Sequence, residues 1–559
     1  MNTQIKEMIE VFCTNTQTRF LVPSGTSLID VVAYAGIKNP ETILAATINN
    51  KTQNLNYRIY SPRTINFLDI FHPSGRRIYA ISLMFLYYKA IKDVYPQGDV
   101  RIMHSMNDGY YTELINIKDT LEVAADKIKQ QMKKLVEQDL PFERKIIESE
   151  PAAQLFESVG MKQKANLIRH SGRLYTNVDS LGETINSFFS NLVLSTRYLR
   201  IFDVVPFEKG LMIFMPDNDK EFKVPGIITN QKKLFDIFTE HKNWVEVLGT
   251  PYVANLNTLV KEGKTNQLIQ VSEALHEKKY AQIADSIYSK KDTVKIVFLA
   301  GPSSSGKTTS CRRLATQLAV LGIKPVQISM DDYFNDRAHT PKDANGEYDF
   351  ECLEALDLEF FNSQMNDLLK GKEIELPKFD FVKGEKHPSG NKIRLSEDSI
   401  LIVEGIHALN PRLSAEIDRK NKYFVFVSAL TQIALDKYNL ISTSDNRLIR
   451  RLVRDYNYRG SSAENTILRW HSVRDGEEKH IFPFQENADS MFNSSLLYEI
   501  GLLKNYCEPL LLNVPQNSLA FAEARRLLYF LNNFVAISPN FIPPTSIMRE
   551  FLGGSSFKY

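Results

Sequence analysis

Residues 293–320 read TVKIVFLAGPSSSGKTTSCRRLATQLAV, and this stretch decides the fold of the second half of the chain. It opens with a continuous apolar run, which is typical of a parallel strand buried on both faces. A glycine-rich turn comes next, and the residues from Lys307 onward are expected to form a helix. The octet 301–308 matches G-x-x-x-x-G-K-[ST] at every defined position. Because it follows a strand and opens a helix, it predicts a phosphate-binding loop.

The predicted loop has the chemistry to hold the polyphosphate of ATP. Its glycines allow backbone N–H groups to turn inward around an anion, and the start of the helix adds the positive end of its dipole. Lys307 is expected to reach the β- and γ-phosphates, and the Thr308 hydroxyl to ligate Mg²⁺. The residues expected to contact ATP in this loop are Gly301, Ser303, Ser304, Ser305, Gly306, Lys307, Thr308 and Thr309.

Three further apolar strands are expected after this unit, at PVQISM (325–330), SILIVEG (399–405) and KYFVFVS (422–428). Strands that alternate with helices predict a doubly wound parallel sheet with right-handed crossovers. Ligands of such sheets bind outside the carboxyl ends of the strands, where Glu404 is a candidate Mg²⁺ ligand. Asp331 and Asp332 end another strand and are candidates to accept a proton from a substrate hydroxyl. The alternative for either aspartate is a helix cap or a solvated loop position.

A cluster of arginines lies further along the chain, in residues 446–460. Four of them are spaced i, i+3, i+4 and i+7, which places them on one helical face. Guanidinium groups packed together repel unless an anion neutralises them, so the cluster predicts a mobile lid over the ATP phosphates. The alternative is a solvated basic face paired with Asp455 or Glu464. The arginines are Arg447, Arg450, Arg451, Arg454 and Arg459.

Composition sets the broad class of the protein. At 559 residues, the chain is long enough for about two to four domains. Its 43% hydrophobic and 24% charged residues are ordinary for globular proteins, and a net charge of +2 predicts no global nucleic-acid footprint. Four widely spaced cysteines, no signal-like h-region and no long apolar run favour a reduced, cytoplasmic protein without a membrane span. No N-K-x-D guanine reader follows Thr308, which argues against a GTPase.

The segment from about 293 to 515 resembles the uridine kinase and phosphoribulokinase family. The resemblance lies in GPSSSGKTT, SMDDYF, PKFDFVKG, LIVEGIHAL and RLVRDYNYRG, in the family's order and spacing. It implies an ATP- and Mg²⁺-dependent kinase in which Asp331 accepts the proton of a ribose 5′-hydroxyl. It also implies that Glu404 is the family's acidic residue, and that the lid carries Arg451, Arg454 and Arg459. The acceptor site would contain Asp331, Tyr333, Phe379 and Phe381, although Gly384 stands near the place of a histidine of uridine kinases.

The first half has resemblances of its own. Residues 1–67 resemble a TGS domain, a β-grasp module, through PSGTSLIDVVAYAG and INFLD. Residues 74–230 resemble the editing-type second domain of threonyl-tRNA synthetases, through KAIKDVYPQG and NDGYYTEL. That domain normally holds a metal, but the positions of its H-x-x-x-H pair carry Ile81 and Phe85, so editing activity is not expected.

The expected organisation is multidomain. A β-grasp unit at 1–67 and an α+β editing-like unit at 74–230 precede a helical connector at 231–290, an α/β kinase domain at 291–535 and a loosely held tail at 536–559. The favoured function is phosphorylation of a ribonucleoside of the uridine or cytidine type, by a protein that can self-associate. Two alternatives stay open: a kinase for another small hydroxyl compound, and a nucleotide-sensing regulator that contacts tRNA or the ribosome through the first half.

Overall fold

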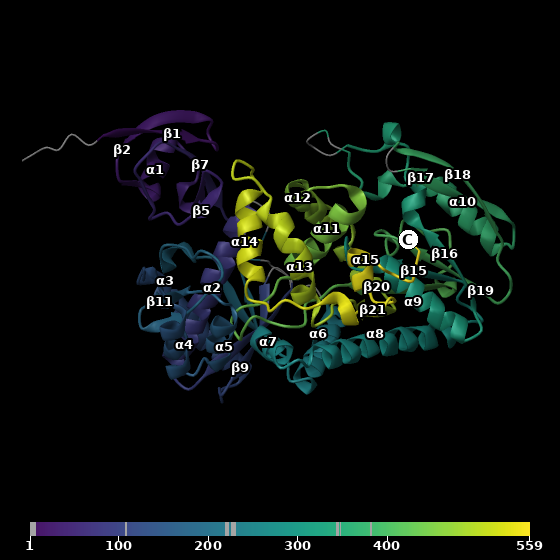
Figure 1. Ribbon diagram of the computed structural model, residues 1–559, viewed down its shortest axis with the longest axis horizontal. Helices are drawn as coiled ribbons and strands as arrows, with labels where there is room; N and C mark the ends of the chain where they lie inside the picture. The colour runs from purple at the N-terminus through teal and green to yellow at the C-terminus, as the bar shows by residue number, and fades with distance from the viewer. Residues whose placement is uncertain are drawn as a thin grey trace, which may run out of the picture.

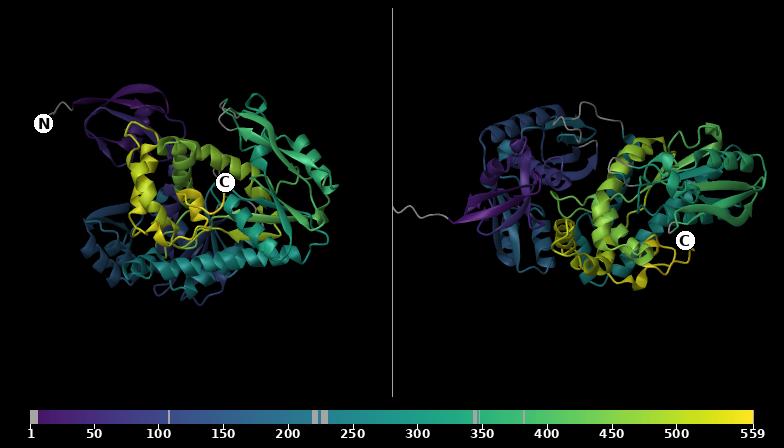
Figure 2. Two further views of the ribbon diagram at one scale, coloured as in Figure 1. Left: turned by 45° about the vertical axis from the view of Figure 1, so that its right-hand side comes forward. Right: turned by 90° about the horizontal axis from the view of Figure 1, so that it is seen from above.

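The computed structural model describes residues 7–106, 109–217, 223–224, 231–342, 346, 348–380 and 383–558. It is a multidomain α/β structure, with a mixed sheet near the N-terminus and a parallel sheet in the second half (Figure 1). Figure 2 shows these two sheets on opposite sides of the molecule, with helices from the C-terminal third between them.

The N-terminal unit is a five-stranded sheet in the order β2-β1-β7-β4-β5, packed on one helix. β1 and β7 are parallel, whereas the other neighbours are antiparallel. That helix is α1 (Leu28–Ala35), and Gly36 ends it in the left-handed region at φ 63°. The strands are β1 (Met8–Cys13), β2 (Thr18–Pro23), β3 (Thr26–Ser27), β4 (Ile43–Ile48), β5 (Lys51–Gln53), β6 (Arg58–Ile59) and β7 (Arg63–Asp69).

The second unit is built around α2 (Pro73–Val94), whose residues from Ile78 to Ile91 are mostly buried. A four-stranded antiparallel sheet, β13-β14-β9-β8, and a smaller sheet, β10-β11-β12, complete it. Phe85 packs on Phe142 and Phe188 at ring-centroid distances of 5.7 and 5.1 Å. The other elements are β8 (Asp99–Met106), β9 (Gly109–Ile115), α3 (Leu121–Glu137), β10 (Phe142–Glu148), α4 (Ser149–Ser158), α5 (Lys162–His170), β11 (Tyr175–Leu181), β12 (Thr184–Asn186), β13 (Asp203–Phe207) and β14 (Gly210–Phe214).

Three helices follow the second unit: α6 (Lys232–Val247), α7 (Val253–Lys261) and α8 (Thr265–Tyr288). The long α8 runs along the base of the view in Figure 1 and packs on the helix after the phosphate loop. The Tyr280 hydroxyl lies 2.9 Å from the Ser310 hydroxyl, and Arg313 pairs with Glu273 at 3.4 Å.

The unit that follows contains a five-stranded parallel sheet in the order β16-β19-β15-β20-β21. The three further strands expected from the sequence are confirmed as β16 (Lys324–Ser329), β19 (Ser399–Glu404) and β20 (Lys422–Ser428). The first strand, β15 (Ile296–Ala300), is buried along its whole length, as an inner strand covered on both faces should be.

Helices cover this sheet, and an antiparallel hairpin, β17–β18, projects from it. The remaining elements are α9 (Lys307–Val320), α10 (Leu358–Leu369), β17 (Ile374–Asp380), β18 (Glu385–Ile393), α11 (Thr443–Arg459), α12 (Ala463–His480), β21 (Ser490–Asn493), α13 (Glu499–Leu512), α14 (Phe521–Leu531) and α15 (Met548–Leu552).

The loop at residues 434–440 ties the two halves together. Lys164 of α5 forms a 2.8 Å ion pair with Asp436, and each side chain is 2% exposed. Lys437 and Tyr438 bind the Asp99 carboxylate at 3.0 and 2.9 Å. Because α11 begins at Thr443, the helix that carries the arginines follows a loop anchored in the second unit.

The end of the chain differs from the expected loose tail. Ile547, Met548 and Phe551 are fully buried, and they belong to the same core as the parallel sheet. No helix within the described ranges is long and apolar enough to cross a membrane.

Candidate active site

The loop between β15 and α9 lies close against the sheet. A Cβ on Gly301 would come within 2.0 Å of the Val427 carbonyl oxygen, so this position requires glycine. Ser304 and Gly306 adopt positive φ angles of 58° and 83°, which turn the backbone into the start of α9. The loop therefore has the strand–turn–helix setting that its motif requires.

Several polar groups of this loop are buried without a partner of their own. The Ser304 and Ser305 hydroxyl oxygens are inaccessible to solvent and have no hydrogen-bond partner among the described residues. Lys307 donates to the Pro302 carbonyl oxygen at 3.2 Å, and burial lowers the pKa of its ammonium group. Unsatisfied buried donors of this kind are costly, so the loop fits a phosphate ligand.

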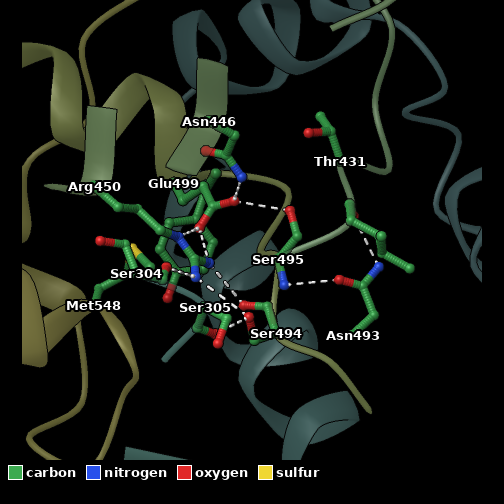
Figure 3. Close-up of polar contacts among 12 residues, drawn as sticks. Ser304, Ser305, Thr431, Asn446, Arg450, Asn493, Ser494, Ser495, Glu499 and Met548 are labelled. Carbon is green, nitrogen blue, oxygen red and sulfur yellow. Dashed lines mark hydrogen bonds and ion pairs between the residues drawn. The ribbon is translucent and has the colours of Figure 1, made fainter. Parts of the chain in front are cut away.

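Arg450 of α11 supports the loop from behind, as Figure 3 shows. Its guanidinium donates to the Ser304 carbonyl oxygen at 3.4 Å, to the Ser494 carbonyl oxygen at 2.8 Å and to Glu499 at 2.9 Å. The side chain is fully buried, and so is Glu499. Arg450 therefore fixes the backbone of the phosphate loop.

Arg447 has the same role one turn earlier. It donates to the Ser303 carbonyl oxygen at 2.9 Å and forms an ion pair with the fully buried Glu477. The backbone N–H of Ser303 donates to the same Glu477 carboxylate at 2.9 Å. This corrects the interpretation that all four regularly spaced arginines face ATP or solvent: Arg447 and Arg450 are fully buried and each is paired with a buried glutamate.

The other three arginines gather around one carboxylate, Asp455. Arg451, Arg454 and Arg459 lie 3.1, 2.7 and 3.8 Å from its oxygens. Arg451 also donates to the Ser303 hydroxyl at 2.7 Å, which brings the cluster to the phosphate loop. Repulsion from the Arg454 guanidinium lowers the pKa of Arg459. Three guanidinium groups with one counter-ion form a site suited to a further anion.

Side-chain oxygens from the ends of β16 and β19 meet the start of α9 beside this loop. The Glu404 carboxylate lies 3.4 Å from the hydroxyls of both Thr308 and Ser329. Burial, and then the charge of Asp331, raise the pKa of Glu404 to about 7. Carboxylate and hydroxyl oxygens are the ligands that Mg²⁺ prefers, so Thr308 and Glu404 fit that ion. The structure thus brings together the two residues expected to hold the metal.

The two candidate aspartates at the end of β16 have different environments. Asp332 is tied to the hairpin, since it pairs with Lys378 at 3.0 Å and accepts from the Phe379 N–H at 3.4 Å. Asp331 has no hydrogen-bond or ion-pair partner in the described part of the chain, and its charge acts on the pKa values of Lys307 and Glu404. Asp331 is therefore the carboxylate available beside the phosphate loop.

Comparison with known proteins agrees with this geometry. The pattern of the phosphoribulokinase/uridine kinase family matches residues 296–496. The uridine kinase of Ligilactobacillus salivarius is 31% identical over 196 residues, which is 35% of this chain and 82% of that protein. The chain belongs to the phosphoribulokinase/uridine kinase family. As a member of this family, it is an ATP-dependent phosphotransferase with a hydroxyl acceptor.

Two other proteins resemble this chain over a smaller share of their length or with a lower score. The uridine kinase of Saccharomyces cerevisiae is 30% identical over 209 residues, covering 36% of this chain and 37% of that protein. A solved structure described as a possible uridine kinase from Bacillus stearothermophilus is 19% identical, covers 39% of this chain and 98% of its own, and has a TM-score of 0.26. At that score the likeness carries no weight.

A further carboxylate of the kinase-family site, Glu351, was not singled out by the sequence. Its Oε2 is buried and has no hydrogen-bond partner among the described residues. Burial, and then the charge of Glu477, raise the pKa of Glu351 to about 7, while Arg451 and Lys307 oppose the shift. Glu351 lies in a loop without a strand or a motif, so no local signal distinguishes it from a surface glutamate.

The aromatic residues expected at the acceptor differ in their placement. Tyr333 is 1% exposed, its hydroxyl donates to Gln364 at 2.7 Å, and its ring packs on Phe361. This corrects its expected role, because a side chain saturated in the core supports the site from beneath and does not face a substrate. Phe379 is 4% exposed and packs on Phe334. Phe381 lies outside the described residues.

Proposed function

We propose that this protein transfers the γ-phosphoryl group of ATP to the 5′-hydroxyl of a ribonucleoside, with uridine or cytidine as the expected acceptor. The observation that carries the proposal is the position of Asp331. It lies two residues after the end of β16, its charge raises the pKa values of Lys307 and Glu404, and it has no hydrogen-bond or ion-pair partner among the described residues. The uridine kinases among its relatives support the nucleoside as acceptor.

Each charged group of the site has a separate role in the proposed reaction. Asp331 takes the proton of the acceptor hydroxyl as its oxygen bonds to the γ-phosphorus, and the bond from that phosphorus to ADP breaks. Lys307 and the cluster Arg451, Arg454 and Arg459 hold the charge on the transferring group. Thr308 and Glu404 would hold Mg²⁺, which supplies further positive charge to the phosphates. Positioning and electrostatics therefore account for the catalysis.

The acceptor pocket departs from a uridine kinase at one position. Gly384 stands near the place of the expected histidine, and a Cβ there would meet the Arg337 guanidinium at 2.8 Å. The Arg337 N–H also donates to the Gly384 carbonyl oxygen at 2.8 Å. Arg337 therefore occupies the space beside the hairpin turn. This arrangement is the reason to include acceptors other than pyrimidine nucleosides in any assay.

We propose for the rest of the chain the organisation expected from its sequence. A TGS-like unit at 1–67 is supported by the mixed sheet packed on α1, and an editing-like unit at 74–230 by the sheets around α2. The connector at 231–290 and the kinase domain at 291–535 complete this division. Four unpaired, buried cysteines fit a cytoplasmic setting. Contact of the first half with RNA, and self-association, remain proposals.

The test is ADP release from ATP and Mg²⁺ with a panel of ribonucleosides and other small hydroxyl compounds, using Asp331→Asn as the control. If the wild type turns over with one nucleoside and Asp331→Asn does not, the proposal is supported and that nucleoside is the acceptor. Turnover with another hydroxyl compound, and with none of the nucleosides, would overturn the nucleoside as acceptor and identify that compound in its place. Salt-sensitive tRNA binding without any turnover would overturn the nucleoside kinase in favour of a nucleotide-sensing regulator.

A further inference from the structure

The C-terminal segment passes directly over the phosphate loop. A Cβ on Gly306 would come within 2.9 Å of the Ile547 side chain, so Ile547 lies against the last residue of the loop. Ile547, Met548 and Phe551 are fully buried, and α15 packs on α11 and contacts the first turn of α9. The segment is therefore part of the wall of the nucleotide site.

This segment places a carboxylate on the first turn of α9. Glu550 Oε2 accepts a hydrogen bond from the Thr309 N–H at 3.2 Å and from the Thr309 hydroxyl at 2.6 Å. Thr309 is the third residue of α9 and lies in the first turn of that helix. The free N–H groups at the start of a phosphate-loop helix are the donors that bind nucleotide phosphates. A side-chain anion thus occupies donors that a phosphate needs.

The charge of Glu550 reaches the catalytic groups as well. It raises the pKa values of Lys307 and Glu404, as the charge of Asp331 does. Nucleotide phosphates would bring further negative charge to this place. Because like charges repel strongly at a half-buried site, the carboxylate and a phosphate cannot share Thr309 without cost.

The segment is also joined to the helix that carries the arginines. Asn457 of α11 donates to the Phe551 carbonyl oxygen at 3.0 Å, and the Arg450 guanidinium lies over the Phe551 ring at 5.3 Å. The Gly553 position lies within 2.9 Å of the Tyr458 hydroxyl, measured from the Cβ that a side chain would place there. A movement of α15 would therefore change its contacts with α11.

We propose that α15 is a nucleotide-gated strap, in which Glu550 occupies a phosphate position on Thr309 and must leave it when ATP binds. In the ligand-free protein, the Glu550 carboxylate partly offsets the positive charge of Lys307. Because this contact must break when ATP binds, it lowers the affinity for the nucleotide. Since Glu550 is half-buried, its side chain can leave Thr309, and the five-residue helix α15 that carries it then loses one of its anchors and loosens. The inference rests on ATP binding at the phosphate loop and is independent of the acceptor.

The test measures ATP binding directly, by titration calorimetry with Mg²⁺ and no acceptor, for the wild type and Glu550→Gln. The amide keeps the shape and one hydrogen bond but removes the charge, so the variant should bind ATP about five- to tenfold more tightly. The matched control is Glu508→Gln, which removes a carboxylate paired with Lys504 on α13 and should leave the affinity unchanged. Thermal melts establish that all three proteins are folded.

A second measurement needs no variant. ATP should increase hydrogen exchange at residues 546–553 of the wild type, because the contact with Thr309 is released. Unchanged or weaker ATP binding in Glu550→Gln, or protection of this segment by ATP, would overturn the strap and leave Glu550 as a cap of α9. Absence of ATP binding in all three folded proteins would instead overturn the nucleotide site and, with it, both proposals.

Discussion

Arg447 and Glu477 form an ion pair in which both side chains are fully buried, and the same carboxylate accepts the N–H of Ser303 in the phosphate loop. One buried pair therefore links α11, α12 and the loop. A guanidinium without its counter-ion is far more costly in such a place than at the surface.

Glu477→Gln should lower the free energy of unfolding by about 3–5 kcal/mol, because it leaves Arg447 buried without a counter-ion. Denaturant titration of the variant against the wild type measures this change. The neighbouring Glu478→Gln is the control, since Glu478 is 44% exposed in its pair with Arg474 and should change stability by less than about 1 kcal/mol. Equal effects of the two substitutions would contradict the assignment.

Asp331→Asn and Asp332→Asn should separate catalysis from positioning. Loss of the Asp331 carboxylate should lower kcat by about 10²–10⁴-fold with ATP binding retained, because the proton acceptor is gone. Asp332 holds the hairpin through Lys378, so its substitution should mainly raise KM for the acceptor. Steady-state kinetics with both substrates varied provides the comparison. A larger loss of kcat in Asp332→Asn would reverse the two roles.

Glu351 should make stability fall as pH rises toward neutrality. Its pKa in the folded protein is about 7, above the ordinary value, so the folded state holds the proton more tightly between about pH 4.5 and 7. Unfolding free energy should therefore decrease across this window, by at most about 3 kcal/mol from this group. Glu351→Gln should flatten the profile, with a residual slope of the same sign from Glu404. An unchanged profile in the variant would argue against the raised pKa.

The Lys164–Asp436 pair should contribute to the joining of the two halves. Lys164→Met leaves Asp436 buried with its remaining donors from Tyr438 and Asn439, and should cost about 2–4 kcal/mol of stability. A double-mutant cycle with Asp436→Asn should give a coupling free energy above about 1 kcal/mol. The exposed Lys162→Met on the same helix is the control. Additive effects in the cycle would show that the pair does not couple the halves.

Local sequence patterns were sufficient for much of the kinase-like unit. The octet at 301–308 and the apolar runs around it predict β15, the loop, α9 and the strands β16, β19 and β20, since each depends on neighbours in the chain. The position of Glu404 beside Thr308 also follows from the sequence, because parallel strands end at the same edge of a sheet.

Side-chain roles that depend on distant partners could not be predicted in this way. The spacing of Arg447 and Arg450 places them on one face of a helix. Their buried partners, Glu477 and Glu499, come from α12 and α13, and the spacing does not show that these helices pack against α11. Tyr333 follows a strand end like a site residue, yet its hydroxyl is taken by Gln364 of α10. Glu351 carries no motif at all.

By itself, the sequence determined the phosphate loop, the parallel sheet and the family, because backbone geometry at glycines and the period of apolar residues act over a few residues. The tertiary structure alone decided which arginines support the loop, and that Glu550 lies on Thr309 across 241 residues of chain. The physical reason is that such contacts depend on the whole core closing around them, where burial turns a modest polar contact into a decisive one.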